Sequence, residues 1–258
     1  MPPGWQGRAP TPGWATDRSA GHGLDATPRW FASAYCCSVA TADAPPRDDL
    51  GGWRRSPARV ALLVASVSFF LGVLTAYAQG WLPEQIGSLA NSSGSWALVA
   101  FLLAMLATTP VAGSVAGALS LVALLGGYVV GAGLRDFPSS TSLIVFWGVA
   151  ALLVGPLLGL GGYWVKDRPG PLAAIGVGAM SGVLIGEGAY GLAFIADTTY
   201  PPYWWGSIGV GLTLLLVVAV QRLTGLRDRV LAAGMCAGSA VAFVVVYTQG
   251  SSMFSLLS

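Results

Sequence analysis

Charged residues are scarce in this chain. Asp, Glu, Lys and Arg together make up 9% of the 258 residues, whereas soluble domains carry about 25%. Hydrophobic residues make up 54%, and a soluble fold could not bury that much apolar surface. The formal net charge of +2 is too small to indicate a nucleic-acid partner. The composition therefore favours an integral membrane protein, with the lipid bilayer as its main partner.

Histidine and cysteine are also scarce. His22 is the only histidine, and Cys36, Cys37 and Cys236 show no metal-ligand spacing, so we expect no metal site and no cofactor. Rhomboid-type and zinc proteases need membrane histidines, and intramembrane aspartyl proteases need two aspartates; the apolar segments contain neither. We therefore expect that the protein is not an enzyme.

The first 53 residues differ from the rest. They are rich in Pro, Gly, Ala and Thr and show neither helical nor strand periodicity, so residues 1–53 are predicted to be a disordered tail. The chain has twelve Arg and one Lys, as expected of a GC-rich genome, and the tail fits translation from upstream of the true start. A helical transmembrane domain is predicted over residues 54–258.

Seven apolar stretches of about twenty residues follow the tail. A helix rises about 1.5 Å per residue, so about twenty residues cross a hydrocarbon core of about 30 Å. The predicted spans are residues 60–79, 94–110, 112–134, 141–163, 172–196, 203–221 and 230–249. The predicted fold class is all-α: a polytopic membrane helix bundle of about seven transmembrane helices.

Basic residues fall in alternate loops. Eight lie on one side of the predicted membrane: Arg54, Arg55, Arg59, Lys166, Arg168, Arg222, Arg227 and Arg229. The opposite side has only Arg135. Because basic residues in short loops resist translocation, the N-terminus is predicted to be cytoplasmic in a multi-pass protein of the plasma membrane.

Glu187 is the only ionisable side chain deep within a predicted span. A charge at the centre of a membrane helix costs about 2.5 to 3.5 kcal/mol on insertion scales, and the spans offer no Lys, Arg or His as a counter-ion. Two interpretations stay open. Glu187 either forms a site for a proton, a cation or a substrate amine, or it is a protonated carboxyl that hydrogen-bonds a neighbouring helix. Tyr190, on the same span, is a further candidate for substrate or ion binding.

The loop over residues 80–93 is long and polar for a connector. It is either an interfacial or re-entrant segment that caps an external vestibule, or an ordinary external loop. Gln79, Glu84, Gln85 and Asn91 are expected to face water. Gln79 and Asn91 join the candidates for substrate or ion binding.

Small residues recur at a spacing of four in the fifth span. Gly178, Gly182 and Gly186 form one stripe on which another helix backbone can approach closely. Gly186 and Gly188 also flank Glu187, where they could kink or loosen the helix, as in substrate-binding helices of transporters.

The segment from Gln79 to Ala104, with the glycine-rich fifth span, resembles a family of small actinobacterial multi-pass membrane proteins of unknown function. The resemblance covers about residues 54–250 and implies class and location, but no catalytic or binding residues. From the residues themselves we expect a small-molecule transporter or substrate-binding membrane subunit that uses Glu187. The alternative is a non-catalytic accessory or scaffold protein, whose glycine-rich helices pack against a membrane-protein partner or a second copy.

Overall fold

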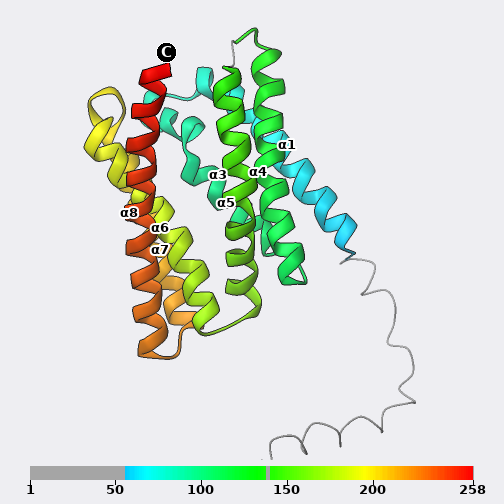
Figure 1. Ribbon diagram of the computed structural model, residues 1–258, viewed down its shortest axis with the longest axis vertical. Coiled ribbons are helices and arrows are strands. Elements are labelled where there is room, and N and C mark those ends of the chain that lie inside the picture. The colour runs from blue at the N-terminus through cyan, green and yellow to red at the C-terminus, as the bar shows by residue number, and fades with distance from the viewer. Residues whose placement is uncertain (1–55, 138–139, 258) are drawn as a thin grey trace, which may run out of the picture. The chain divides into compact units, whose positions relative to one another are not determined.

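The computed structural model describes residues 56–137 and 140–257, and these residues form helices and no strand (Figure 1). The α-helices are α1 (Pro57–Trp81), α2 (Glu84–Gly87), α3 (Ser93–Ala104), α4 (Pro110–Gly133), α5 (Thr141–Asp167), α6 (Pro171–Phe194), α7 (Pro201–Arg222) and α8 (Leu226–Leu257), and the short 3-10 helices are η2 (Ser88–Asn91) and η3 (Ala196–Thr198). The predicted tail, with His22, Cys36 and Cys37, lies outside the described residues.

Six helices are long and apolar enough to cross a membrane: α1, α4, α5, α6, α7 and the part of α8 that ends at Gln249. Four of them begin with proline at the first helical turn, where the missing N–H costs nothing. Large apolar side chains such as Phe70, Leu152 and Val220 are exposed on their outer faces, as lipid contact requires. The chain is a multi-pass membrane helix bundle, and the predicted all-α class is confirmed.

The second predicted span, residues 94–110, is wrong as a continuous helix. α3 ends at Ala104 after 12 residues, which is about 18 Å of helix and too short to cross alone. The helical segment Glu84–Asn91 precedes α3 and meets it at 60° across Ser92, so the two make one broken segment. The bundle therefore has six continuous spans, or seven if this broken segment counts as one. The end of this helix could not be predicted from hydropathy, because the turn residues 105–107 are as apolar as the helix itself.

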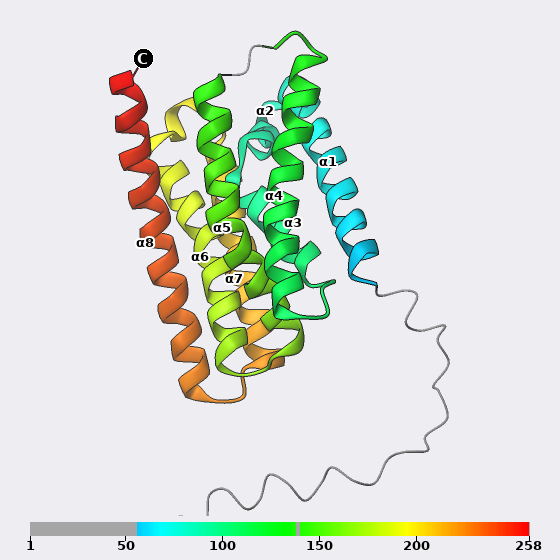
Figure 2. The same cartoon turned by 45° about the vertical axis from the view of Figure 1, so that its right-hand side comes forward.

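α6 is the central helix of the bundle. Of its most apolar window, 67% is buried, more than in any other span. It packs against α8 and α7, and against α5 where Gly176 meets Gly161. On the far side, α4 packs between α1 and α5. Figure 2 shows α8 at one edge of the bundle and α1 at the opposite edge.

Glycine beside Glu187 does not interrupt α6, which runs unbroken from Pro171 to Phe194. A Cβ at Gly186 would lie 2.8 Å from the carbonyl oxygen of Ala240 in α8. One at Gly188 would lie 2.7 Å from the carbonyl oxygen of Trp204 in α7. The two glycines thus admit close neighbours on both sides, and the helix continues through them without a break.

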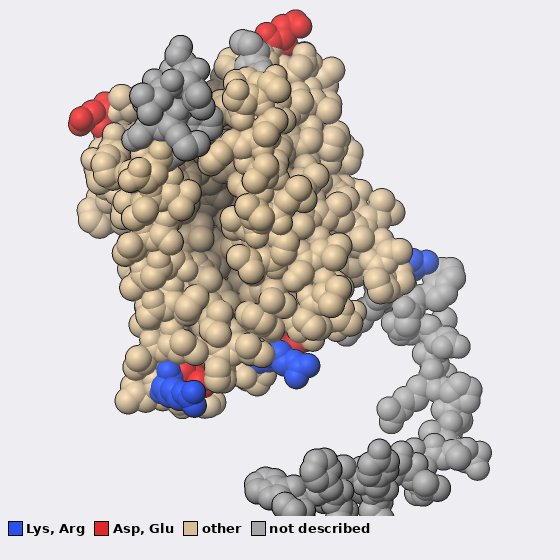
Figure 3. Space-filling view, viewed as in Figure 1, with Lys and Arg blue, Asp and Glu red and all other residues tan. Residues whose placement is uncertain are grey.

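Charged side chains lie towards the ends of the helices. Figure 3 shows Lys and Arg at the lower end of the molecule and at its right edge, some Asp or Glu beside the lower group, further Asp or Glu at the upper end, and a broad uncharged surface between the two ends. By the rule that basic loops stay in the cytoplasm, we call the end that carries residues 82–92 and 195–200 the outer end.

Candidate functional site

Glu187 of α6 binds the start of α3. Its Oε2 accepts a hydrogen bond of 2.8 Å from the Ser92 hydroxyl. Its Oε1 accepts bonds of 3.0 Å from the Ser93 hydroxyl and from the Gly94 N–H. The side chain is only 5% exposed. Three neutral donors therefore surround this carboxyl group, and the contact ties α3 to α6.

The local sequence explains why α3 begins here. Ser92 has an extended backbone, and its hydroxyl accepts a hydrogen bond of 3.0 Å from the Ser95 N–H, which caps the helix. The first N–H groups of a helix lack partners and carry partial positive charge, so they suit a carboxylate. Gly94 leaves room for that carboxylate, because a Cβ there would overlap Oε2 of Glu187.

A charged side chain also holds the other end of α3. Lys166, near the end of α5, donates a hydrogen bond of 3.0 Å to the carbonyl oxygen of Ala107, just beyond α3. A cation suits the negative end of a helix dipole, as a carboxylate suits the positive end. This short helix is thus fixed at its start by α6 and beyond its end by α5.

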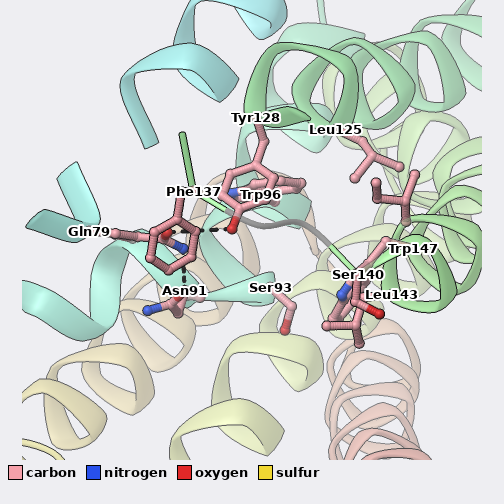
Figure 4. A pocket seen from close by; sticks show the side chains of 13 residues that line it. Gln79, Asn91, Ser93, Trp96, Leu125, Tyr128, Phe137, Ser140, Leu143 and Trp147 are labelled. Atoms are coloured by element: carbon pink, nitrogen blue, oxygen red, sulfur yellow. Dashed lines mark hydrogen bonds between the residues drawn. The ribbon is translucent and has the colours of Figure 1, made fainter. Parts of the chain in front are cut away.

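A cavity of about 330 Å³ lies beside the start of α3, in the outer half of the bundle between α1, α3, α4 and α5 (Figure 4). We call it the first cavity. Its walls combine aromatic and aliphatic side chains with uncharged polar groups, and none of its lining residues is charged. The lining residues are Gln79, Ala90, Asn91, Ser92, Ser93, Trp96, Leu125, Tyr128, Phe137, Ser140, Leu143, Ile144 and Trp147.

A chain of hydrogen bonds forms one wall of the first cavity. Gln79 Nε2 donates to Asn91 Oδ1 at 2.6 Å, and the Tyr128 hydroxyl donates to Gln79 Oε1 at 3.4 Å (Figure 4). These contacts join α1, η2 and α4. Gln79 and Asn91, both predicted as candidates for binding, therefore contact each other at this cavity.

A second cavity, of about 440 Å³, lies between α2, α3, α6 and α7. Its lining shares Ser92 alone with the first cavity. Tyr203 of α7 interacts with Ser92, Tyr247 of α8 interacts with Ser93, and both phenols lie in the electrostatic field of Glu187. The bond between Glu187 and Ser92 is thus made where the two cavities adjoin.

Comparison with known proteins places the chain in a family. The model of a family of unknown function (DUF6518) matches residues 52–252. The chain belongs to this family. No curated protein and no solved structure matches it. The expected resemblance to an uncharacterised family is confirmed, and this family has no assigned activity.

The structure brings together three of the four predicted binding residues. Gln79 and Asn91 line the first cavity, and Glu187 lies behind it through its bonds to Ser92 and Ser93. Tyr190 does not line either cavity. Its ring packs against Phe194 at 5.1 Å and against Tyr247 at 5.4 Å between centroids, in an aromatic cluster between α6 and α8.

The predicted glycine stripe of α6 faces α8. A Cβ at Gly178 would lie 2.5 Å from the carbonyl oxygen of Ala232, and one at Gly182 would overlap the carbonyl oxygen of Cys236. Together with the contact of Gly186 described above, the stripe brings the two helix backbones close over its whole length. The glycine stripe is therefore covered by α8 of the same chain.

Sequence reasoning missed the aromatic walls of the first cavity. Trp96, Tyr128 and Trp147 lie near the outer ends of three different predicted spans, a position that is also typical of anchors at the membrane surface. The available signal was that all three residues lie at the same depth in the membrane, where they can line one cavity. Among the described residues, no group of three or more His, Cys, Asp or Glu side chains could hold a metal ion.

Proposed function

We propose that this protein binds a small organic molecule in the first cavity, as a carrier or as the substrate-binding subunit of one. The observation that carries the proposal is a cavity of about 330 Å³ at the outer end, lined by rings, aliphatic groups and a few uncharged polar groups. Sites for small molecules are typically concave, largely apolar and of about 300 to 1,000 Å³.

The broken helix supports the same function. In many transporters, substrate sites are formed by discontinuous membrane helices, whose freed ends meet the substrate or a coupling ion. Here α3 begins inside the bundle, and Ser92 and Ser93 at its start line the first cavity. A structural tether alone accounts for Glu187, but not for a cavity of this size beside it.

The test is binding to the purified full chain in lipid nanodiscs. A panel of a few hundred small water-soluble molecules is screened by thermal shift, and hits are titrated by tryptophan fluorescence. Ile144→Trp fills the first cavity, whereas Val145→Trp places the same bulk on the exposed face of α5. We expect at least one ligand whose binding is lost in Ile144→Trp and kept in Val145→Trp. A panel without ligands, or binding that survives Ile144→Trp, would contradict the proposal.

A second candidate function is that of an accessory protein that packs against a membrane partner. The specific observation is on α8, where a Cβ at Gly234 or Gly238 would meet nothing within 4 Å. Small residues four apart with open space before them suit a close helix contact. If a second copy packs against this face, the double variant Gly234→Leu and Gly238→Leu should lower the oligomeric state in nanodiscs. If lipid covers the face, the oligomeric state should not change.

A further inference from the structure

Several polar groups that line the first cavity are bonded already. Gln79 bonds both Asn91 and Tyr128, and the hydroxyls of Ser92 and Ser93 bond Glu187. A ligand rich in hydrogen-bonding groups would have to compete with these contacts, because a buried polar group left unpaired is costly. The lining suits a ligand that needs few hydrogen bonds.

Aromatic rings make up much of the remaining wall. Trp96 of α3 and Tyr128 of α4 meet edge to face, with 6.1 Å between ring centroids. Trp147 of α5 lines another side of the same cavity (Figure 4). The faces of aromatic rings are electron-rich and attract cations, and tryptophan attracts them most strongly.

The electrostatic surroundings favour the same sign of charge. None of the described residues that line the cavity is basic, and the carboxyl group of Glu187 lies directly behind Ser92 and Ser93. The basic residue Arg135, beyond the end of α4, donates to the carbonyl oxygen of Ala76 and lies over the Tyr77 ring. The partners of Glu187 at the start of α3 are three hydrogen-bond donors, which favour the ionised form of the carboxyl group, and none of these partners is a basic side chain. Charges act over longer distances within a protein than in water. In its ionised form, Glu187 would repel an anion in the cavity and attract a cation.

We propose that the first cavity selects small organic cations, and quaternary or tertiary ammonium groups in particular. A quaternary ammonium has no N–H to satisfy, so it suits a cavity in which several polar groups are already paired with one another. The ammonium lies among Trp96, Tyr128 and Trp147, within the field of Glu187. This inference rests on the proposed function and names the ligand class for the same cavity.

The test compares three probes of nearly equal shape. They are choline, its uncharged carbon analogue 3,3-dimethylbutan-1-ol, and the anion 3,3-dimethylbutyrate. Each is titrated into the full chain in nanodiscs of uncharged lipid at fixed ionic strength, and binding is followed by tryptophan fluorescence. Choline should bind about tenfold more tightly than the alcohol, because ring faces and Glu187 act only on the charged probe. The anion should bind more weakly than both.

Variants identify the groups responsible. Glu187→Gln should weaken choline binding about threefold, as one of the two contributions to the tenfold preference, and leave the alcohol unchanged, and the retained alcohol binding shows that the cavity is intact. Trp96→Leu should weaken choline binding, whereas Trp81→Leu should not, because Trp81 is 72% exposed and lies outside the cavity.

Each contrary outcome is decisive. Equal binding of choline and the alcohol, with both lost in Ile144→Trp, overturns selection of cations and leaves the proposed function standing. Absence of choline binding also overturns the selection, whereas the proposed function falls only if the broad panel yields no ligand. A choline preference that is unchanged in Glu187→Gln overturns the role of that carboxyl group.

Discussion

Replacing Glu187 with alanine should destabilise the bundle, because three donors at the start of α3 lose their common acceptor. Hydrogen bonds between membrane helices contribute about 0.6 kcal/mol on average and up to about 1.7 kcal/mol. Three such bonds give a loss of about 2 to 5 kcal/mol in the free energy of unfolding. The Gly94 N–H is fixed by the backbone and contributes most, since the hydroxyls of Ser92 and Ser93 can turn to other acceptors.

Glu187→Gln should cost less, about 1 kcal/mol, because its amide oxygen still accepts the bonds of Ser93 and Gly94. The assay is reversible unfolding in mixed micelles, followed by circular dichroism. Glu84→Ala is the matched control, since Glu84 is exposed on α2, and it should change stability by less than about 0.5 kcal/mol. A Glu187→Ala variant as stable as this control would refute the account of Glu187 as the tether of α3.

Three further predictions concern packing and the ends of α3. Gly94→Ala should lower the free energy of unfolding by about 1 to 3 kcal/mol, because its Cβ overlaps Glu187, and the loss should shrink in a background that lacks the Glu187 carboxyl. Lys166→Met should cost about 1 kcal/mol and speed amide exchange at the end of α3, as it removes the donor to Ala107. Gly182→Leu should disrupt the contact of α6 with α8 and lower the melting temperature by several degrees, whereas Gly234→Leu, which points into open space, should not.

Long apolar helices could be predicted from the sequence because length and hydropathy are local properties. Each of the helices α1 and α4 to α8 contains a predicted span, and most of their ends lie within a few residues of the predicted ones. Prolines such as Pro110, Pro171 and Pro201 lie at the starts of these helices. The glycine stripe of α6 was visible for the same reason, since its spacing is a property of one helix. Its partner, α8, was not visible, because pairing of helices depends on the whole bundle.

The helical segment Glu84–Asn91 before α3 could not be read from local pattern. The start of α3 could be predicted near residue 94, because Ser92 is a local helix cap, but the approach of Glu187 from a segment far along the chain could not. The sequence indicated that Glu187 needs a partner, because a lone carboxyl in a span is costly. It did not indicate which partner, since the three donors lie more than ninety residues away.

The first cavity follows from the same long-range arrangement. Gln79 and Asn91 were predicted because they are polar residues beside a membrane span. Trp96 and Trp147 were not, because a tryptophan near the end of a span is as typical of the membrane surface as of a cavity. Only the packing of α1, α3, α4 and α5 distinguishes the two.

The most direct test of the account is whether water reaches the first cavity from the outer side. In a chain whose cysteines at 36, 37 and 236 are replaced by alanine, Leu125→Cys lines the cavity, and Val122→Cys lies one turn away on the exposed face of α4. Intact cells are treated with a membrane-impermeant thiol reagent. The account predicts labelling at position 125 and none at position 122. Protection of position 125 in a stably inserted protein would contradict it.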